Sequence, residues 1–293
     1  TMIIYLWHRV PIINRMVYAI PLSIISGAIV IPSIYHLNPI KKEFLTYEAS
    51  FSDILGILFF NYVVSNQVID IIGISVFIIN IFISIILSFF ITIILLKIIV
   101  LSEAKVKFFL LFSILILLYI FGKMINLPSL LIILIFAIII SNKDKIKIYR
   151  FKNIFLNEKF DNTIEILYSL TNESSFLVRT FFFLLFGYSM NLSSLLSFEV
   201  ISLGSLIVLI LFTIRAFFMK YLLGNNIFPD IFYMPRGLIT ILLFYKIPSE
   251  LKLTEFSDGV VYFVILATSI IMFVGSLLYK TPVEESENIN QNY

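Results

Sequence analysis

The sequence predicts an all-α polytopic membrane protein, and three observations lead to that prediction. Of the 293 residues, 60% are hydrophobic and only 13% are charged, whereas about a quarter of a soluble domain is charged. The apolar residues form runs close to the length of about 20 residues with which an α-helix crosses a bilayer. Two of these runs, one in each half of the chain, are interrupted by glycine and proline, which favours helices that break inside the membrane.

The apolar runs predict about nine membrane-crossing helices. They cover residues 16–36, 45–65, 71–100, 107–122, 127–141, 175–194, 198–222, 228–247 and 259–279. The 71–100 run is too long for one span, so we expect a short interfacial helix near Val68–Ile72 followed by a tilted span. Gly122 and Pro128 separate the two short spans that follow it.

Residues 142–173 differ from the runs on either side, because they are rich in lysine and also carry acidic side chains. The excess of positive charge predicts a cytoplasmic linker, and its recurring apolar residues predict an amphipathic helix on the membrane surface. The chain then divides into a first transmembrane half (1–141), the linker (142–173), a second half (174–280) and a polar cytoplasmic tail (281–293). Because the sequence starts with Thr1 before Met2, we expect the first half to be incomplete at its N-terminus.

Each half contains one interrupted helix. Ser26, Gly27 and Pro32 interrupt the 16–36 span, while Pro235 and Gly237 interrupt the 228–247 span. Paired interruptions in two halves are typical of the binding region of transporters built from inverted repeats. The pattern therefore favours a secondary active transporter.

Asp53 is the principal candidate for binding a transported ion. It lies about eight residues into its span, roughly 12 Å along the helix and near the membrane centre. A carboxylate removed from water holds a proton more readily, so such a group can bind a proton or a cation in turn. Ser52 beside it offers a hydroxyl oxygen, the ligand type that hard cations prefer.

Glu48 is expected to have a structural role. It lies about 140° around the helix from Asp53, so the two carboxylates do not share a face. A buried carboxylate without a positive partner is strongly unfavourable. The available partners are Arg215 and Arg236, which lie within later spans.

Four segments resemble motifs of the monovalent cation:proton antiporter superfamily and occur in that family's order. Residues 47–53 are similar to the signature helix of its electroneutral, sodium/proton exchanger branch, in which a Glu precedes an Asn-Asp pair. Residues 179–187 resemble its phenylalanine-rich helix ending in glycine, and residues 234–240 resemble its Pro-Arg-Gly-Leu motif. Arg215 stands where the family often has a basic residue.

The resemblance implies an inverted-repeat antiporter fold with crossed broken helices. It assigns Asp53 as the ion- and proton-binding carboxylate, with Ser52 in place of the family's Asn, and it pairs Glu48 with an arginine. The implied cargo is Na⁺, or K⁺ or Li⁺, exchanged for H⁺ without a cofactor. A homodimer of the full-length form in the cytoplasmic membrane is also implied, with the lipid bilayer as its surroundings.

The chain departs from the family pattern at two places. Val30, Ile31 and Pro32 stand where the family usually has Thr-Asp-Pro, and Ala49 stands where a ligating Ser is frequent. These changes remove oxygen ligands. Backbone carbonyls of the interruption near Ser26–Val30 are expected to supply oxygens instead.

The sequence also allows two other functions and disfavours a third. The chain could be an inactive or accessory fragment of such a transporter, or a transporter for a small organic anion bound by its arginines. A membrane enzyme is disfavoured, because we find no catalytic His, Ser-His or paired-Asp arrangement. With no cysteine and two histidines, no metal site is expected, and the small net charge of +3 with its basic residues in loops gives no indication of nucleic-acid binding.

Overall fold

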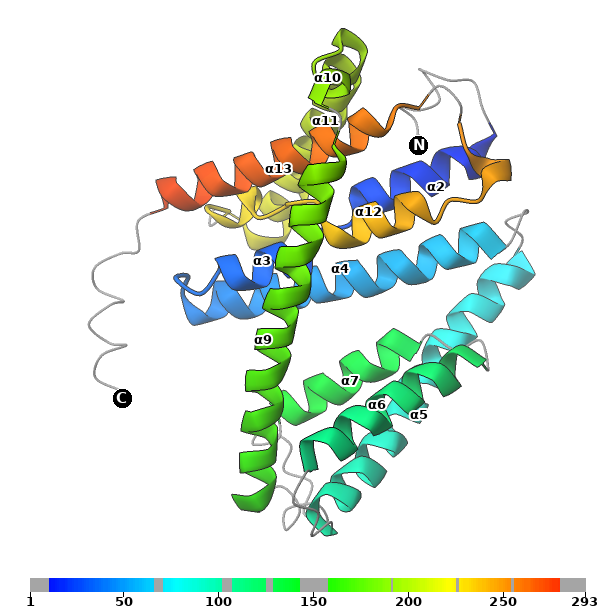
Figure 1. Cartoon of the computed structure of the whole chain (residues 1–293), viewed down its shortest axis with the longest axis vertical. Helices are drawn as coiled ribbons and strands as arrows, with labels where there is room; N and C mark the ends of the chain where they lie inside the picture. Colours follow the sequence, from blue (N-terminus) through cyan, green and yellow to red (C-terminus); the bar gives the residue numbers. More distant parts are fainter. Residues whose placement is uncertain are drawn as a thin grey trace. The chain divides into compact units, whose positions relative to one another are not determined.

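The computed structural model is helical throughout its described elements, which confirms the all-α part of the prediction (Figure 1). It describes residues 11–65, 71–101, 107–124, 129–142, 158–190, 192–224, 227–253 and 256–279, and no strand occurs among them. Within this part of the chain, four helices are long and apolar enough to cross a membrane. They are Ile12–Ser33, Ile71–Ile91, Phe198–Leu222 and Asp258–Leu278.

Large apolar side chains are exposed along these helices. In the helix that begins at Ile71, for example, Ile79 is 54% exposed and Phe82 is 62% exposed. Water would disfavour such a surface by about 25 cal/mol for each Å² of apolar area, whereas a lipid tail would not. The surface is therefore compatible with a membrane protein, as the composition predicts.

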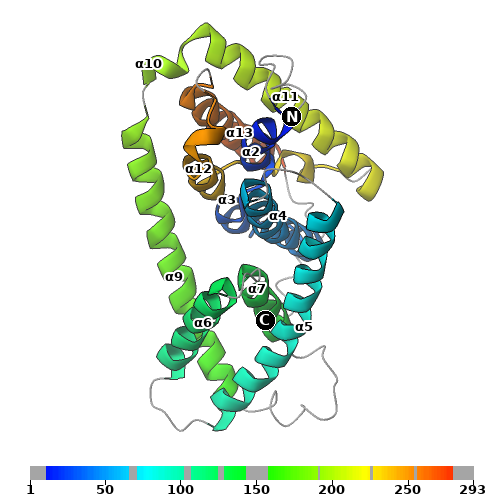
Figure 2. The ribbon, with the colours of Figure 1, turned by 90° about the vertical axis from the view of Figure 1, so that its right-hand side faces the viewer.

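The chain forms two compact units, residues 1–68 with 179–293 and residues 69–178. The second unit contains α5 (Ile71–Leu101), α6 (Lys107–Met124), α7 (Ser129–Ser141) and the first part of α9 (Glu158–Ser189). Figure 2 shows α7 beside both α5 and α6. The hydroxyl of Ser88 in α5 donates to the carbonyl of Ile132 in α7 over 2.7 Å, so a buried polar contact links these apolar helices.

The first unit contains the interrupted segments. Its helices are α2 (Ile12–Ser23), α3 (Gly27–Ser33), α4 (Pro39–Ser65), α10 (Leu192–Leu195), α11 (Phe198–Leu223), α12 (Leu238–Tyr245) and α13 (Asp258–Leu278), with the 3₁₀ turns η2 (Asp230–Phe232) and η3 (Ser249–Leu251). Both α2 and α3 pack on α4, α12 packs on α2 and α4, and α11 packs on α13 (Figure 1). Chain segments about 200 residues apart therefore lie side by side in this unit.

A buried apolar cluster holds this unit together around α3 and α4. Val30 and Ile34 from α3 and the following turn contact Leu45 and Ala49 from α4, and Tyr233 joins them from the segment before α12. All five side chains are fully buried. Val30 and Ala49, at which the sequence resemblance pointed to lost oxygen ligands, thus contribute apolar packing.

One predicted boundary differs from the structure, and one expected helix is only partly covered. The helix α5 runs without a break from Ile71 to Leu101, close to the predicted run 71–100, and most of the short helix expected near Val68–Ile72 lies outside the described part. The expected boundary between linker and membrane span near residue 174 falls inside α9, a single 32-residue helix. No glycine or proline occurs between Glu158 and Phe186, so nothing in the backbone ends the helix where the composition changes.

Candidate functional site

The first interruption separates α2 from α3 by three residues. Ile24 and Ser26 have extended backbones, with φ/ψ of −72°/129° and −78°/109°. The backbone N–H of Ser26 donates to the carbonyl of Pro235 over 2.9 Å, instead of continuing α2. The break therefore lies at residues 24–26, directly before Gly27, while Pro32 lies within α3.

The second interruption is the non-helical segment between η2 and α12, residues 233–237. Arg236 is 3% exposed, and its guanidinium joins the two interruptions. Its Nε donates to the carbonyl of Leu22 over 2.7 Å, and its Nη1 donates to the carbonyl of Met234 over 2.9 Å. The backbone N–H of Arg236 donates to the hydroxyl of Thr268 in α13. Carbonyls that the breaks remove from helical bonding are thus satisfied by one side chain.

Gly237 allows the two interruptions to approach each other. A Cβ atom at this position would lie 2.6 Å from Oγ and 3.0 Å from Cβ of Ser26, and 2.9 Å from Cδ1 of Ile29. All three atoms belong to the segment that crosses it. Any larger residue would push the two interruptions apart.

We expect Gly237→Ala to destabilise the protein by about 1–3 kcal/mol, the usual cost of overpacking. The measurement is the midpoint of thermal unfolding in detergent. Gly187→Ala in α9 is the matched control, because a Cβ there meets nothing within 4 Å and alanine favours a helix. Equal midpoints for the two variants would contradict the close approach of the two interruptions, which we call their crossing.

Asp53 and Ser52 in α4 face the first interruption. Oδ2 of Asp53 accepts a hydrogen bond from the backbone N–H of Gly27 over 2.9 Å, and Oγ of Ser52 accepts one from the N–H of Ile25 over 2.9 Å. These N–H groups lack helical partners because they stand at or before the start of α3. The interruption therefore turns positive backbone dipoles toward the carboxylate of Asp53.

Four buried oxygen atoms near the two interruptions have no hydrogen-bond partner among the described residues. They are Oδ1 of Asp53, Oγ of Ser26, Oγ1 of Thr240 and Oδ1 of Asp230, whose other oxygen is bonded to Lys41. Buried polar atoms are nearly always paired, so unpaired ones call for an explanation. Oxygen atoms of a carboxylate and of hydroxyls are the ligands that hard cations prefer.

The Glu48 carboxylate is held by Arg215. Nη1 of Arg215 donates to Oε1 over 2.8 Å, and Nη2 donates to Oε2 over 3.0 Å. Nε and Nη2 of the same guanidinium also donate to the carbonyl of Asp230, and Nε also donates to that of Ile231. The sequence offered Arg215 and Arg236 as possible partners of Glu48. In the structure Arg215 forms the ion pair with Glu48, and Arg236 bonds to backbone carbonyls at the interruptions.

A second ion pair lies before the second interruption. The Nζ of Lys41, near the start of α4, bonds to Oδ2 of Asp230 and to the carbonyl of Phe228. Asp230 is 1% exposed. The sequence gives no reason to connect these two residues, which are 189 positions apart, and neither stands out from other charges near the span ends.

Two of the backbone carbonyls between Ser26 and Val30 accept hydrogen bonds from other groups. The carbonyl of Ser26 accepts bonds from the N–H groups of Ile29 and Val30, and the carbonyl of Ala28 accepts one from Arg179. Toward α4, the first interruption presents the N–H groups of Ile25 and Gly27. Thr240, which is not among the predicted site residues, contributes a hydroxyl because α12 starts directly after the second interruption.

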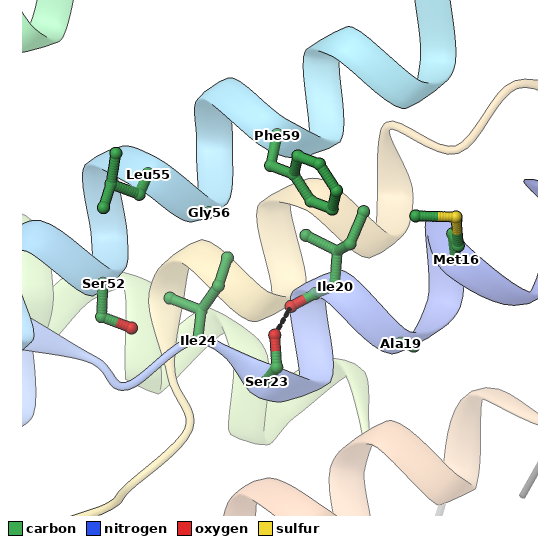
Figure 3. A pocket seen from close by; sticks show the side chains of 9 residues that line it. All are labelled: Met16, Ala19, Ile20, Ser23, Ile24, Ser52, Leu55, Gly56 and Phe59. Carbon is green, nitrogen blue, oxygen red and sulfur yellow. Dashed lines mark hydrogen bonds between the residues drawn. The ribbon is translucent and has the colours of Figure 1, made fainter. Parts of the chain in front are cut away.

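A cavity of about 490 Å³ lies between α2 and α4 and reaches Ser52. Figure 3 shows Ser52 opposite Ile24 at one end, with Met16 and Phe59 toward the other. The hydroxyl of Ser23 donates to the carbonyl of Ile20 at its edge. The cavity thus brings a space of several water volumes up to the residue next to Asp53.

Comparisons with known proteins do not extend these observations: no model of a protein family matches the chain, and a search of curated proteins finds no significant match. Within the described residues, no three His, Asp or Glu side chains gather in a way that could hold a metal ion.

Proposed function

We propose that the protein is a secondary active transporter that exchanges a monovalent cation, Na⁺ in the first place, for H⁺ across the cytoplasmic membrane. One observation carries this proposal. Two interrupted segments meet beside the carboxylate of Asp53, and one oxygen of that carboxylate has no hydrogen-bond partner among the described residues. Ser52, Ser26 and Thr240 supply further oxygens at or near the crossing.

Exchange requires one site for which two ligands compete. Oδ1 of Asp53 can carry a proton when the site faces the proton-rich side and can bind a cation after the proton has left. The N–H of Gly27 holds Oδ2 in place, so the carboxylate keeps its position in both states. Lowering the pH favours the proton and therefore raises the cation concentration needed for half-maximal exchange.

The charges around the crossing fit a site for one cation. Glu48 is paired with Arg215 through two hydrogen bonds, and Asp230 is paired with Lys41. Asp53, by contrast, contacts no cationic side chain in the described part of the chain and accepts only the N–H of Gly27. Arg236 donates to the carbonyl of Leu22, just before the first interruption, and to that of Met234 in the second, so its guanidinium is held by the backbone of both segments.

The order of elements supports an inverted-repeat architecture for this function. The interrupted segment α2–α3 is followed by the long helix α4, and the interrupted segment η2–α12 is followed by the long helix α13. Paired interrupted helices that meet near a buried charge are the usual binding region of such transporters. About nine spans, a bilayer environment, a homodimer of the full-length form and the absence of enzymatic activity belong to the same proposal.

A transporter for an organic anion is less compatible with the geometry. Such a carrier would need arginine donors directed at its substrate. All three guanidinium nitrogens of Arg215 donate to protein acceptors, and Nε and Nη1 of Arg236 do so as well.

An inactive or accessory form is the second candidate, favoured by a specific observation. Val30 and Ala49, at two positions where the family has oxygen ligands, are fully buried in an apolar cluster. Loss of these ligands would weaken cation binding.

Exchange itself is tested in proteoliposomes with an imposed pH gradient. We expect added Na⁺, Li⁺ or K⁺ to drive proton movement, and the rate to be independent of membrane potential, because one titrating carboxylate releases one proton for each cation. The potential is clamped with valinomycin, or with another ionophore if K⁺ is the substrate. A rate that follows the potential would overturn the one-for-one ratio, and no cation-driven movement would favour the inactive form.

A further inference from the structure

The short helix α3 contains a backbone carbonyl that its own helix cannot satisfy. In an α-helix the carbonyl of residue 28 accepts from the N–H of residue 32. Residue 32 is Pro32, which lies inside α3 and has no N–H. The carbonyl of Ala28 therefore needs a donor from outside the helix.

Arg179 supplies that donor. Its Nη1 lies 2.6 Å from the carbonyl oxygen of Ala28, and both residues belong to the first compact unit. Its neighbours in α9, Val178 and Phe181, are exposed by 57% and 59%, as suits a helix face toward lipid. A charged residue on such a helix is costly, and the part-buried carbonyl of Ala28 gives it a specific acceptor.

The bonded carbonyl lies one residue from the proposed ion site. Gly27, the neighbour of Ala28, donates its N–H to Asp53, and Ser26 before it carries one of the unpaired buried hydroxyls. A shift of α3 along its axis would move both groups relative to the carboxylate. The C-terminal part of α9 is itself fixed, because Phe186 packs edge-on against Tyr262 of α13 with ring centroids 5.1 Å apart.

We propose that Arg179 is a positioning residue for cation binding at Asp53, acting through the carbonyl that Pro32 leaves without a helical donor. The inference rests on the proposed function for its transport readout. It assigns α9 a role beyond packing: this helix sets the position of the start of α3 against α4.

The pairing of Arg179 with Pro32 allows a test by double substitution. Arg179→Met removes the donor at nearly the same side-chain length and should raise the apparent KM for the cation about tenfold, the effect of losing one charged hydrogen bond, with little change in kcat. Pro32→Ala restores an N–H that can bond to Ala28 within α3; residue 32 is exposed, so the change leaves no buried cavity, and the KM of this single variant is the reference. In the double variant the KM should return to within about threefold of the Pro32→Ala value.

Recovery of the KM in the double variant distinguishes two roles of Arg179: positioning α3 for cation binding, or only attaching α9 to the rest of the unit. Pro32→Ala restores bonding inside α3 but does not reattach α9, so a KM that is equally high in Arg179→Met with and without Pro32→Ala would overturn the proposal. An unchanged KM in Arg179→Met would also overturn it. Arg179→Lys keeps a positive donor and should stay within about threefold of the original KM, which provides a folded variant if Arg179→Met is not recovered from the membrane.

A second readout does not depend on transport. The chain has no cysteine, so Ser26→Cys introduces one buried thiol whose labelling by N-ethylmaleimide reports opening of the interruption. Labelling should be faster when Arg179→Met is added and slow again when Pro32→Ala is also present. If the unsubstituted protein shows no exchange, the proposed function fails, but the order of labelling rates still tests the Arg179 contact. Equal labelling rates in the three Ser26→Cys variants would overturn the proposed role of this contact without bearing on the proposed function.

Discussion

Replacing Asp53 with asparagine should reduce cation-driven proton movement to the level of empty liposomes. An amide does not titrate in the physiological range, so it cannot release a proton when a cation binds. Its carbonyl oxygen can still accept the hydrogen bond that Gly27 donates to Asp53 over 2.9 Å. The variant should therefore keep its fold and lose its exchange.

The control is the same chemical change at a carboxylate away from the interruptions. Asp258 is exposed in the first turn of α13, and Asp258→Asn should leave the exchange rate nearly unchanged. The measurement follows internal pH after addition of Na⁺, Li⁺ or K⁺ to vesicles with matched protein content. Undiminished exchange in Asp53→Asn would exclude Asp53 as the site, whereas an equal loss in both variants would point to a general effect of carboxylate removal.

A substitution of Ser52, next to Asp53, should lower the affinity for the cation but leave the exchange mechanism intact. Ser52 presents a hydroxyl to the N–H of Ile25 and lines the cavity between α2 and α4. Its role is thus divided between holding the interruption and offering an oxygen. Asp53 alone supplies the titrating group.

The positions of α11, α13 and the first interruption could be predicted from the sequence because hydropathy and helix-breaking residues act locally. The 198–222 and 259–279 runs coincide with α11 and α13 to within a residue or two. Ser26 and Gly27 stand where α2 gives way to α3. Each of these features depends on a run of neighbouring residues, so distant packing does not alter it.

The contacts between distant segments could not be predicted in the same way. Glu48 lies 167 positions from Arg215, and both Arg215 and Arg236 were chemically suitable partners. The packing of α11 beside η2 brings Arg215 to Glu48, while the crossing directs Arg236 to backbone carbonyls. The composition of residues 142–173 was equally ambiguous, because polar residues can continue a helix such as α9 when no glycine or proline ends it.

Hydroxyl groups were the least predictable part of the site. Serine and threonine are common in membrane helices and often bond only to their own backbone, as Ser33 and Thr213 do here. Oγ1 of Thr240 is buried without such a bond among the described residues. Only its place directly after the second interruption distinguishes it, and that depends on the fold.

The largest loss of stability is expected from Arg215→Met. The variant would leave the Glu48 carboxylate without its bidentate partner and the carbonyls of Asp230 and Ile231 without their donor. Removing one member of a buried ion pair costs about 3–5 kcal/mol. The Glu48 side chain is 19% exposed and that of Arg215 is 6% exposed, so the ion pair is largely buried and the loss of its donors is costly.

Glu48→Gln should therefore be milder, at about 1–3 kcal/mol, since Arg215 keeps its bonds to the backbone before α12. The matched control for Arg215→Met is Lys220→Met, which removes an exposed positive charge from the same helix, α11, and should change stability by less than about 0.5 kcal/mol. The midpoint of thermal unfolding in detergent should then fall in the order Lys220→Met, Glu48→Gln, Arg215→Met. If Glu48 and Arg215 stabilise the fold through their ion pair, adding Glu48→Gln to Arg215→Met should lower the midpoint by less than Glu48→Gln does alone. Strictly additive losses would mean that each side chain stabilises the fold through other contacts.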